Sequence, residues 1–494
     1  MSKQLPERPD LGQLKKQAKD LLNEVRAGRP EAVARVPEAE RPEFSLADAQ
    51  RIIAREYGFP SWPKLKLHVE TRDHAIAMAR LVGAAVNGDA ATVAALCQER
   101  PGLARESVSA CAALGDLEGL AAWVKRNPEF ARAQGGIART EALGYVCLGR
   151  VGADDAGRVA CADLLLAAGA NPNATWAAGE SPEEAMPILY AAAGRNNLPR
   201  LTARLLAAGA QPNDGESIYH AAEHYHPECL AALVAAGGDI SRRDEKWQNT
   251  PLYFLIGWEP GARNSERARQ GILWLLEHGA NPNIPSYEVG ETPLFGAIRN
   301  GWDLELIEAF VRHGADVQFR RTDGRSACAV AVRYGRTDAV KFLLAQGAPD
   351  DASPEDRFLG ALAAADETEA RRWLRENPGW KARHTGKIAK VLLLAARRGT
   401  TPVLALAARL GLDFDRPDRT GQRPLHGAAF YGRAEAVAKL LELGADLERP
   451  DDTYHASPLG WCVYGSTHCA AVGADYGGAA AAFRAAGAVI PPVS

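Results

Sequence analysis

The sequence predicts an all-α protein built as a solenoid, in which short helix pairs stack on one another. Three observations predict this fold class: an apolar phrase ending in glycine recurs along the chain, its copies are about 33 residues apart, and 47% of the residues are hydrophobic. One helix pair cannot bury its apolar face alone, whereas stacked neighbours bury a continuous core. The 494 residues are therefore expected to form one long array.

The recurring phrase consists of an apolar run, Gly-Ala, and then Asn or Asp, as in Leu164–Asn173 and Leu275–Asn283. Glycine ends a helix because it adopts the left-handed conformation easily, and Asn or Asp favours a turn. Each copy is therefore predicted to be the second helix of a unit, followed by a finger-like turn. The marker glycines are Gly169, Gly209, Gly237, Gly279, Gly314, Gly347, Gly411 and Gly444.

A second phrase, usually containing Pro-Leu, begins many of the units. Thr before Pro predicts a helix start, since Thr can cap free N–H groups and Pro is tolerated in the first turn. Paired small residues such as Ala428-Ala429 let two helices approach closely. The copies are Asn249–Tyr253, Glu291–Phe295, Arg423–Ala429 and Ser457–Leu459.

Together these phrases resemble the ankyrin repeat, which has the same period and a Thr-Pro-Leu-His-x-Ala signature. The resemblance is clear over about residues 160–450 and fainter on both sides, where helix pairs continue without the finger consensus. It implies short β-hairpin-like fingers and a concave face made of fingers and first helices, where family members usually bind proteins. About twelve units are expected between residues 73 and 490.

The segments before and after the clear repeats differ in pattern. The first 72 residues resemble the helical leader of bacterial ankyrin arrays and are expected to cover the apolar end of the first unit. Insertions interrupt the period at about 134–158, 174–186, 257–268 and 465–478. The predicted organisation is a helical leader or cap (1–72), degenerate ankyrin-like helix pairs (73–158), ankyrin repeats (159–350), degenerate repeats (351–415), and C-terminal repeats with a cap (416–494).

Composition excludes several classes of function. The chain has 58 Lys and Arg against 61 Asp and Glu, so a globally basic nucleic-acid binder is excluded and no nucleic-acid partner is expected. No apolar run approaches the length of a membrane span, and the N-terminus has no secretory pattern. None of the eight cysteines forms a Cys-x-x-Cys pair. We therefore expect a cytoplasmic monomer with reduced thiols and no membrane contact.

One short string suggests an alternative function. His220-Ala-Ala-Glu-His224 matches the pattern of some zinc peptidases, and on a helix its two histidines would share a face. His220, however, also occupies the register of the repeat histidine, and no third ligand can be placed. We therefore expect no metal and no cofactor. Glu223 stands where the repeat has a small Ala, so it needs a partner, for which His224, His226 or an arginine are candidates.

The alternative hypothesis is that the chain is an enzyme or small-molecule binder, with a pocket formed by residues of this string, His220, Glu223 and His224, and by Tyr253. A second string, Gly379–Lys387, resembles a phosphate loop only loosely. It has six residues between its glycines instead of four, and Ile388 follows the lysine. It is rejected as a phosphate loop.

The favoured hypothesis is a non-enzymatic scaffold that binds a protein or peptide on its concave face. Aromatic and arginine side chains, which are the usual interface anchors, fall on the expected fingers and first helices. The arginines favour a partner with an acidic stretch. For any one residue the alternative is that an aromatic ring packs between fingers or an arginine is merely solvated. The expected binding residues are Trp176, Tyr219, His220, Trp247, Tyr253, Tyr287, Phe295, Arg320, Arg321, Arg325 and Arg423.

Overall fold

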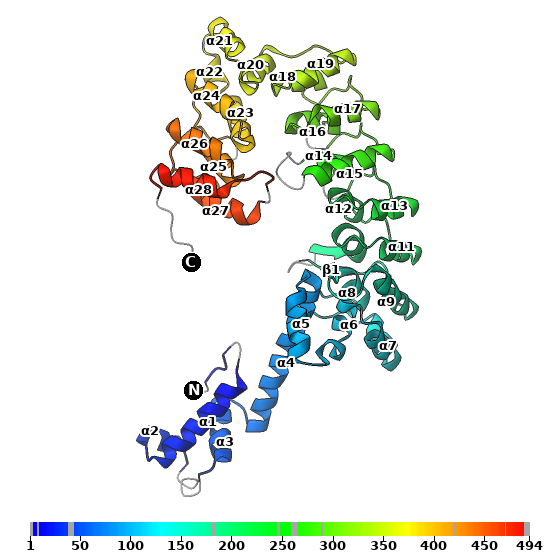
Figure 1. Cartoon of the computed structure of the whole chain (residues 1–494), viewed down its shortest axis with the longest axis vertical. Helices are drawn as coiled ribbons and strands as arrows, with labels where there is room; N and C mark the ends of the chain where they lie inside the picture. The colour runs from blue at the N-terminus through cyan, green and yellow to red at the C-terminus, as the bar shows by residue number, and fades with distance from the viewer. Residues whose placement is uncertain are drawn as a thin grey trace. The chain divides into compact units, whose positions relative to one another are not determined.

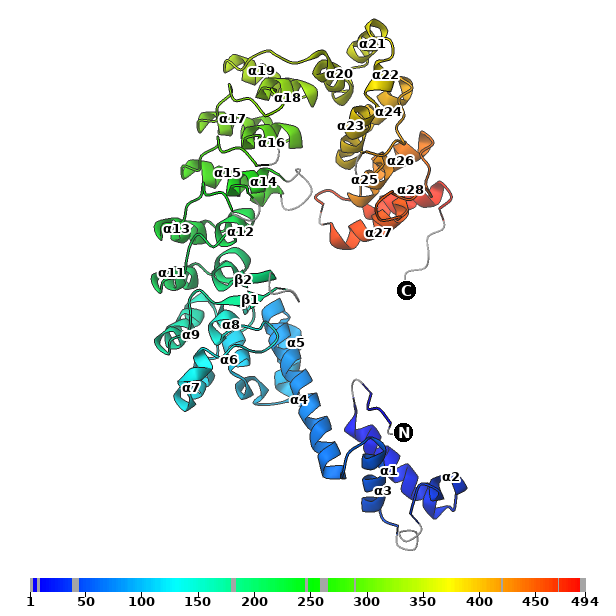
Figure 2. The same cartoon turned by 180° about the vertical axis from the view of Figure 1, so that it is seen from behind.

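The computed structural model describes residues 3–6, 9–37, 44–178, 184–244, 248–257, 265–287, 290–418, 421–469 and 471–488. The chain divides into two compact units, Met1–Ile188 and Leu189–Ser494. Helices dominate both units (Figures 1 and 2). Within the described residues, the one regular pair of strands is the antiparallel hairpin of β1 (Thr175–Ala177) and β2 (Ala185–Pro187).

The leader forms a small core of its own in the first unit. Its helices are α1 (Leu11–Arg26), α2 (Pro30–Val33), α3 (Leu46–Glu56) and the N-terminal half of α4 (Trp62–Asn87). Their buried side chains run from Leu14 to Val69. Helix α4 continues past this core, so the predicted boundary at residue 72 lies inside a single helix. The C-terminal half of α4 packs on the first repeat helices, and the capping role of the leader stays a prediction.

Three helix pairs follow in the first unit. The first joins the end of α4 to α5 (Ala90–Glu99); the others are α6 (Val108–Leu114) with α7 (Leu117–Arg126), and α8 (Ala142–Leu148) with α9 (Asp155–Ala167). Two 3-10 turns, η2 (Leu103–Glu106) and η3 (Pro128–Ala131), follow α5 and α7. The predicted insertion at 134–158 therefore includes α8, a regular repeat helix. Arg158 is buried there and donates to the carbonyl oxygens of Val146 (2.9 Å) and Val151 (3.0 Å).

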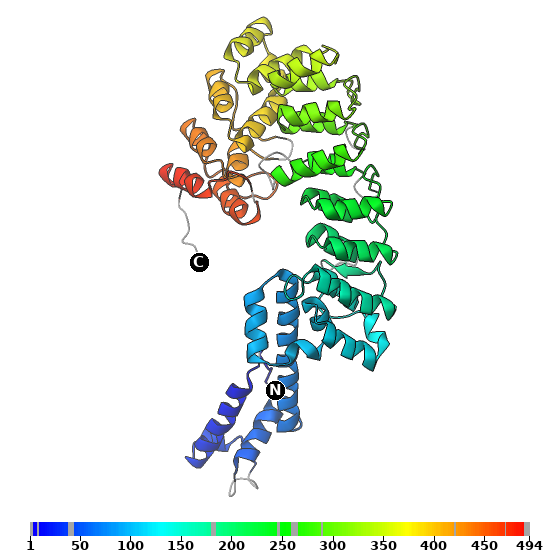
Figure 3. The same ribbon diagram turned by 45° about the vertical axis from the view of Figure 1, so that its right-hand side comes forward.

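Nine helix pairs make up the second unit, and Figure 3 shows them as successive layers. With the three earlier pairs, the described residues confirm the predicted twelve. The pairs are α10 (Ile188–Tyr190) and the π-helical turn η5 (Ala191–Arg195) with α11 (Pro199–Ala207), α12 (Ser217–Glu223) with α13 (Pro227–Ala235), α14 (Pro251–Ile256) with α15 (Ser265–Glu277), α16 (Pro293–Asn300) with α17 (Leu304–Arg312), α18 (Ala327–Arg333) with α19 (Thr337–Ala345), α20 (Pro354–Ala363) with α21 (Glu367–Glu376), α23 (Thr385–Arg398) with α24 (Thr401–Arg409), α25 (Pro424–Phe430) with α26 (Ala434–Glu442), and α27 (Pro458–His468) with α28 (Tyr476–Ala485). A short helix, α22 (Trp380–Arg383), precedes α23.

The stack of the second unit is continuous through the degenerate repeats. Helix α20 packs on α18, α23 packs on α20, and α25 packs on α23. The contact between α18 and α20 is close because a Cβ on Gly360 would lie 1.9 Å from the carbonyl oxygen of Val332. Only glycine fits such an approach of two backbones. One apolar core extends from Phe358 to Ala488 across this region.

Side-chain amides connect neighbouring fingers, which are hairpin-like turns as the ankyrin resemblance implied; in one of them the Arg321 amide donates to the Arg325 carbonyl (3.0 Å). Asn213 accepts a hydrogen bond from the Asp239 amide (2.8 Å) and donates to the Gly237 carbonyl (3.2 Å). Two repeats further on, Asn283 makes the same two bonds to Asp316 and Gly314, at 2.8 Å each. At these two junctions the asparagine that ends the phrase therefore joins its turn to the next turn. Gly209 ends its helix with φ +97°, as the phrase predicts.

None of the described helices combines the length and apolar character needed to cross a membrane.

Candidate partner-binding surface

Several of the predicted binding residues are buried and hold repeats together instead. Tyr219 is 7% exposed; its hydroxyl donates to the Asn249 carbonyl (2.7 Å) and accepts from the Asp244 amide (3.1 Å). It therefore fixes the finger of the next repeat. Phe295 is fully buried within α16, and Arg423 is 4% exposed at the start of α25. These three residues cannot contact a partner, because their side chains are already enclosed by the array.

The other aromatic candidates are differently placed. Tyr287, after the Asn281–Asn283 turn, is 75% exposed and open to a partner. Trp176 is half-buried on β1 in the first unit, opposite Met186 of β2. Trp247 lies outside the described residues. Of the aromatic side chains predicted for the surface, Tyr287 has the greatest accessibility among those described.

Two of the predicted arginines, Arg321 and Arg325, form ion pairs with buried carboxylates. Glu291 is 1% exposed, and its carboxylate accepts hydrogen bonds from Arg299 (2.7 Å) and Arg321 (2.9 Å). The Tyr253 hydroxyl donates to the same carboxylate at 2.9 Å. Burial alone would lower the pKa of Arg299, but Glu291 outweighs it and raises that pKa. The Arg299 guanidinium is therefore charged, and its bonds and those of Arg321 to Glu291 fix both side chains in position.

A second buried carboxylate repeats this arrangement one unit further on. The Asp356 carboxylate accepts hydrogen bonds from the Ser353 hydroxyl (2.5 Å), from Arg325 (3.0 Å) and from Arg333 (2.8 Å). Burial raises the pKa of Asp356, but its bonds to Ser353 and the two arginines outweigh this and lower it. Asp323 joins the two groups, since Arg321 and Arg325 contact it at 3.3 Å and 2.7 Å. We call Arg299, Arg321, Arg325 and Arg333 with these carboxylates the arginine network.

Sequence reasoning selected Arg321 and Arg325 but missed Arg299, Arg333, Glu291 and Asp356. The paired residues are one repeat apart, because Arg321 bonds Glu291 across 30 positions and Arg325 bonds Asp356 across 31. Opposite charges at the repeat period are the signal that could have found them. Arg320, the remaining predicted arginine of this finger, is half-exposed and contacts Asp351.

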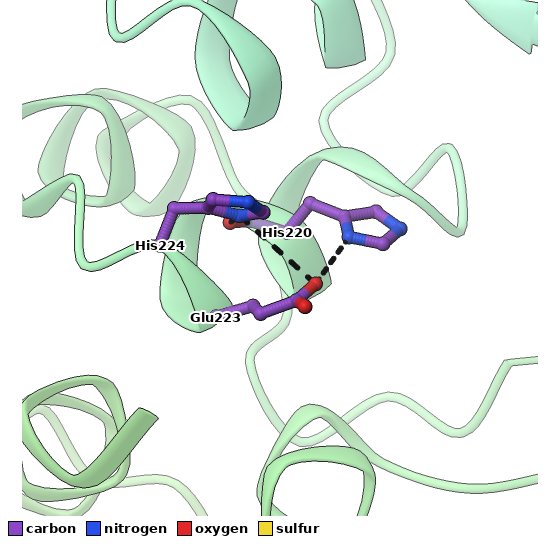
Figure 4. Close-up of side chains that lie close together, drawn as sticks. All are labelled: His220, Glu223 and His224. Atoms are coloured by element: carbon purple, nitrogen blue, oxygen red, sulfur yellow. Dashed lines mark hydrogen bonds and ion pairs between the residues drawn. The ribbon is translucent and has the colours of Figure 1, made fainter. Parts of the chain in front are cut away.

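The His220, Glu223 and His224 side chains do come together on α12 (Figure 4). His220 contacts Glu223 through Nδ1 (2.7 Å) and Glu216 through Nε2 (3.1 Å). Burial would lower the pKa of His220, but these two hydrogen bonds outweigh it and raise the pKa to about 9. At neutral pH the imidazole is therefore protonated in the metal-free chain, and it would have to lose a proton before it could ligate a metal.

The expected partner of Glu223 was His224, His226 or an arginine, and the closest partner is His220. His224 lies 4.0 Å from the carboxylate, while Nδ1 of His226 contacts the Ala193 carbonyl at 2.8 Å. Tyr253 bonds Glu291 rather than this cluster. The alternative pocket of His220, Glu223, His224 and Tyr253 is therefore not assembled, because Tyr253 lies apart from the cluster, and His220 forms ion pairs with Glu216 and Glu223.

Comparisons with known proteins agree with the repeat architecture. A model of three ankyrin repeats matches residues 262–353, and a single ankyrin-repeat model matches residues 420–452. The mouse B-cell lymphoma 3 protein homolog is 29% identical over 159 residues, which are 31% of this chain and 34% of that protein. The ankyrin repeat and KH domain-containing protein mask-1 of Caenorhabditis elegans is 29% identical over 140 residues, 28% of this chain and 5% of that protein.

The chain thus spans about a third or less of the length of these relatives. Both are animal proteins, so the expected bacterial character of the leader finds no support. Among solved structures, the human ASB11 ankyrin repeat domain is 25% identical, with a TM-score of 0.37, and covers 49% of this chain and 98% of that domain. The two matched segments fall on the helix pairs described above, so the chain contains ankyrin repeats over residues 262–353 and 420–452.

Proposed function

We propose that the chain is a non-enzymatic scaffold that binds a protein or peptide partner with an acidic stretch. The arginine network is the observation that supports this function. Four guanidiniums from successive repeats are held on one side by buried carboxylates, and the edges of their side chains remain partly exposed. Arginine presents several donors in a rigid fork that suits carboxylates. Binding to groups already held in place costs little ordering entropy.

Tyr287 and Arg320 extend this surface toward the fingers. Both side chains are accessible, and Tyr287 offers a large ring with few rotatable bonds. We propose that they contact the partner directly, while Arg299 and Arg321 set the electrostatic field. A cytoplasmic location and a monomeric state belong to the same proposal, and the eight free cysteines support reducing surroundings.

The test uses the full chain and two labelled peptides of equal length, poly-Glu and poly-Gln. Fluorescence anisotropy should show salt-sensitive binding of poly-Glu and none of poly-Gln. The variant Tyr287→Ala with Arg320→Gln should weaken poly-Glu binding about tenfold, since each removes one exposed contact. The matched control, Tyr464→Ala with Arg375→Gln, changes an exposed tyrosine and an exposed arginine elsewhere and should bind as wild type. Equal binding of the two peptides, or no effect of the first variant, would refute the proposed surface.

A further inference from the structure

A pocket of about 660 Å³ lies between α18 with its preceding finger and the segment α22–α23. Its wall is strongly basic: six lining side chains are cationic and two are anionic. The cationic residues are Arg321, Arg325, Arg333, Arg383, Lys387 and Lys390, and the anionic residues are Asp323 and Asp418. The positive charges come from two separate parts of the array, which face the same space.

The two sides of the pocket differ in how their charge is compensated. Arg325 and Arg333 contact Asp356 and Glu355, and Lys387 and His384 contact Glu355. Among the described residues, neither Arg383 nor Lys390 has a carboxylate within ion-pairing distance. The Arg383 guanidinium instead lies 6.0 Å from the Trp380 ring centroid. The pocket therefore holds two accessible cations whose charge the protein does not neutralise.

The surroundings of Lys390 show the same excess of positive charge. The pocket walls displace water from its amine, and Arg299, Arg333 and Arg321 repel it, so the pKa of Lys390 is lowered. Asp418 raises the pKa of Lys390, but by less than the other effects lower it. A bound anion would relieve this repulsion.

The start of α23 adds backbone donors to the pocket. This helix of 14 residues begins at Thr385, and no side chain caps it. Gly386, which lines the pocket, has open space where a Cβ would be. The first N–H groups of a helix attract anions, most strongly multivalent ones. The spacing of the segment 379–387 excludes a phosphate loop. The segment nevertheless contributes Arg383, Gly386 and Lys387 to the basic pocket, at the start of α23.

From these observations we propose that the pocket between α18 and α22–α23 binds a phosphoryl group. A single carboxylate would neutralise one charge, whereas a phosphoryl group offers two negative charges and three oxygens to donors that converge from several directions. The group could belong to a free phosphate compound or to a phosphorylated side chain. The inference does not rest on the proposed protein partner, since a free compound would satisfy the same donors.

Isothermal titration of the full chain with pyrophosphate and with a phosphoserine peptide tests this inference. The expected result is saturable binding of at least one of them, about tenfold tighter than binding of citrate or of the unphosphorylated peptide. If pyrophosphate binds and the phosphopeptide does not, the source is a free compound. If the phosphopeptide binds about tenfold tighter than pyrophosphate, the source is a modified protein. Both results support the pocket.

The variant Arg383→Gln with Lys390→Gln should weaken that binding at least about tenfold. Because neither residue is ion-paired, its melting temperature should equal or exceed that of wild type. The control Arg375→Gln with Lys341→Gln should bind normally. Absence of saturable binding, equal binding of citrate, or undiminished binding by the first variant would overturn the inference. Poly-Glu binding is measured separately, so failure here leaves the scaffold proposal standing.

Discussion

Two histidines occupy the same position of their repeats and differ in charge. His220 in α12 and His426 in α25 each stand fourth in the Thr-Pro-Leu-His register. His220 lies between two carboxylates, which raise its pKa to about 9. His426 is 1% exposed, and burial lowers its pKa. One repeat therefore carries a half-buried cation where the other carries a buried neutral ring.

The cause lies in two neighbouring positions of the sequence. Four residues before the histidine and three after it are Glu216 and Glu223 in α12, but Gln422 and Ala429 in α25. These positions share a helix face with the histidine. The two repeats thus share the same helix pair, and the side chains at these two positions decide whether the histidine forms ion pairs. The following changes test this difference, beginning with the largest expected effect.

Replacing the charged histidine should have the largest effect. His220→Leu leaves Glu223, 12% exposed, beside Glu216 without a cation, and should destabilise α12 by about 3 kcal/mol at pH 7. His426→Leu replaces a neutral buried ring by an apolar side chain of similar size and should cost about 1 kcal/mol or less. Hydrogen exchange of α12 and α25 in the full chain measures both values. Equal losses in the two helices would contradict the assigned charge states.

Restoring the repeat consensus should have a smaller effect. Glu223→Ala places in α12 the residue that α25 has at Ala429, and removes one of the two bonds to His220. We expect a loss of about 1–2 kcal/mol at pH 7, together with a lower pKa of His220. Histidine-labelled NMR measures that pKa directly. A His220 pKa that stays near 9 in this variant would show that Glu216 alone sustains the charge.

The two repeats should respond to pH in opposite directions. The folded pKa of His220 exceeds its unfolded value of 6.5, so its contribution is complete below pH 6.5 and is lost as the pH rises through about 9. We expect a loss of about 1–2 kcal/mol, after allowance for partial solvent screening. For His426 the folded pKa is lowered, so α25 should weaken as the pH falls below 6.5. Hydrogen exchange at several pH values, corrected for intrinsic rates, would show whether the signs differ.

Zinc should have the smallest effect. A protonated His220 must lose its proton before it can ligate, so equimolar Zn²⁺ at pH 7 should shift the melting temperature by less than about 1 °C. EDTA-treated protein is the reference. A shift of several degrees that disappears in His224→Ala would instead assign a metal site to α12.

Much of the architecture could be predicted because its signals are local. Gly209 and Thr250-Pro251 fix a helix end and a helix start within a few residues, so the repeat period and the number of helix pairs follow from reading along the chain. Burial is less local. Phe295 occupies the position of the repeat histidine, so the sequence predicts that it lies on the concave face. In the structure it is fully buried, because neighbouring repeats enclose its ring.

The candidate sites depend on contacts between distant repeats, so they were predicted only in part. Arg321 and Arg325 were selected for their charge alone, and the carboxylates that hold them are a full repeat away. The basic pocket joins the finger at Arg321 to Lys390, 69 positions later in the chain. The spacing of residues within one repeat cannot predict this pocket, because the pocket forms only when three or four units stack.

The Asn213 and Asn283 contacts have an evolutionary consequence. At these two junctions each side-chain amide satisfies one backbone N–H and one backbone carbonyl of the following unit. A change of length by one complete unit keeps the partners in register, whereas a change by half a unit leaves those backbone groups without their partners. The array is therefore expected to tolerate whole-repeat changes of length at these junctions better than partial ones.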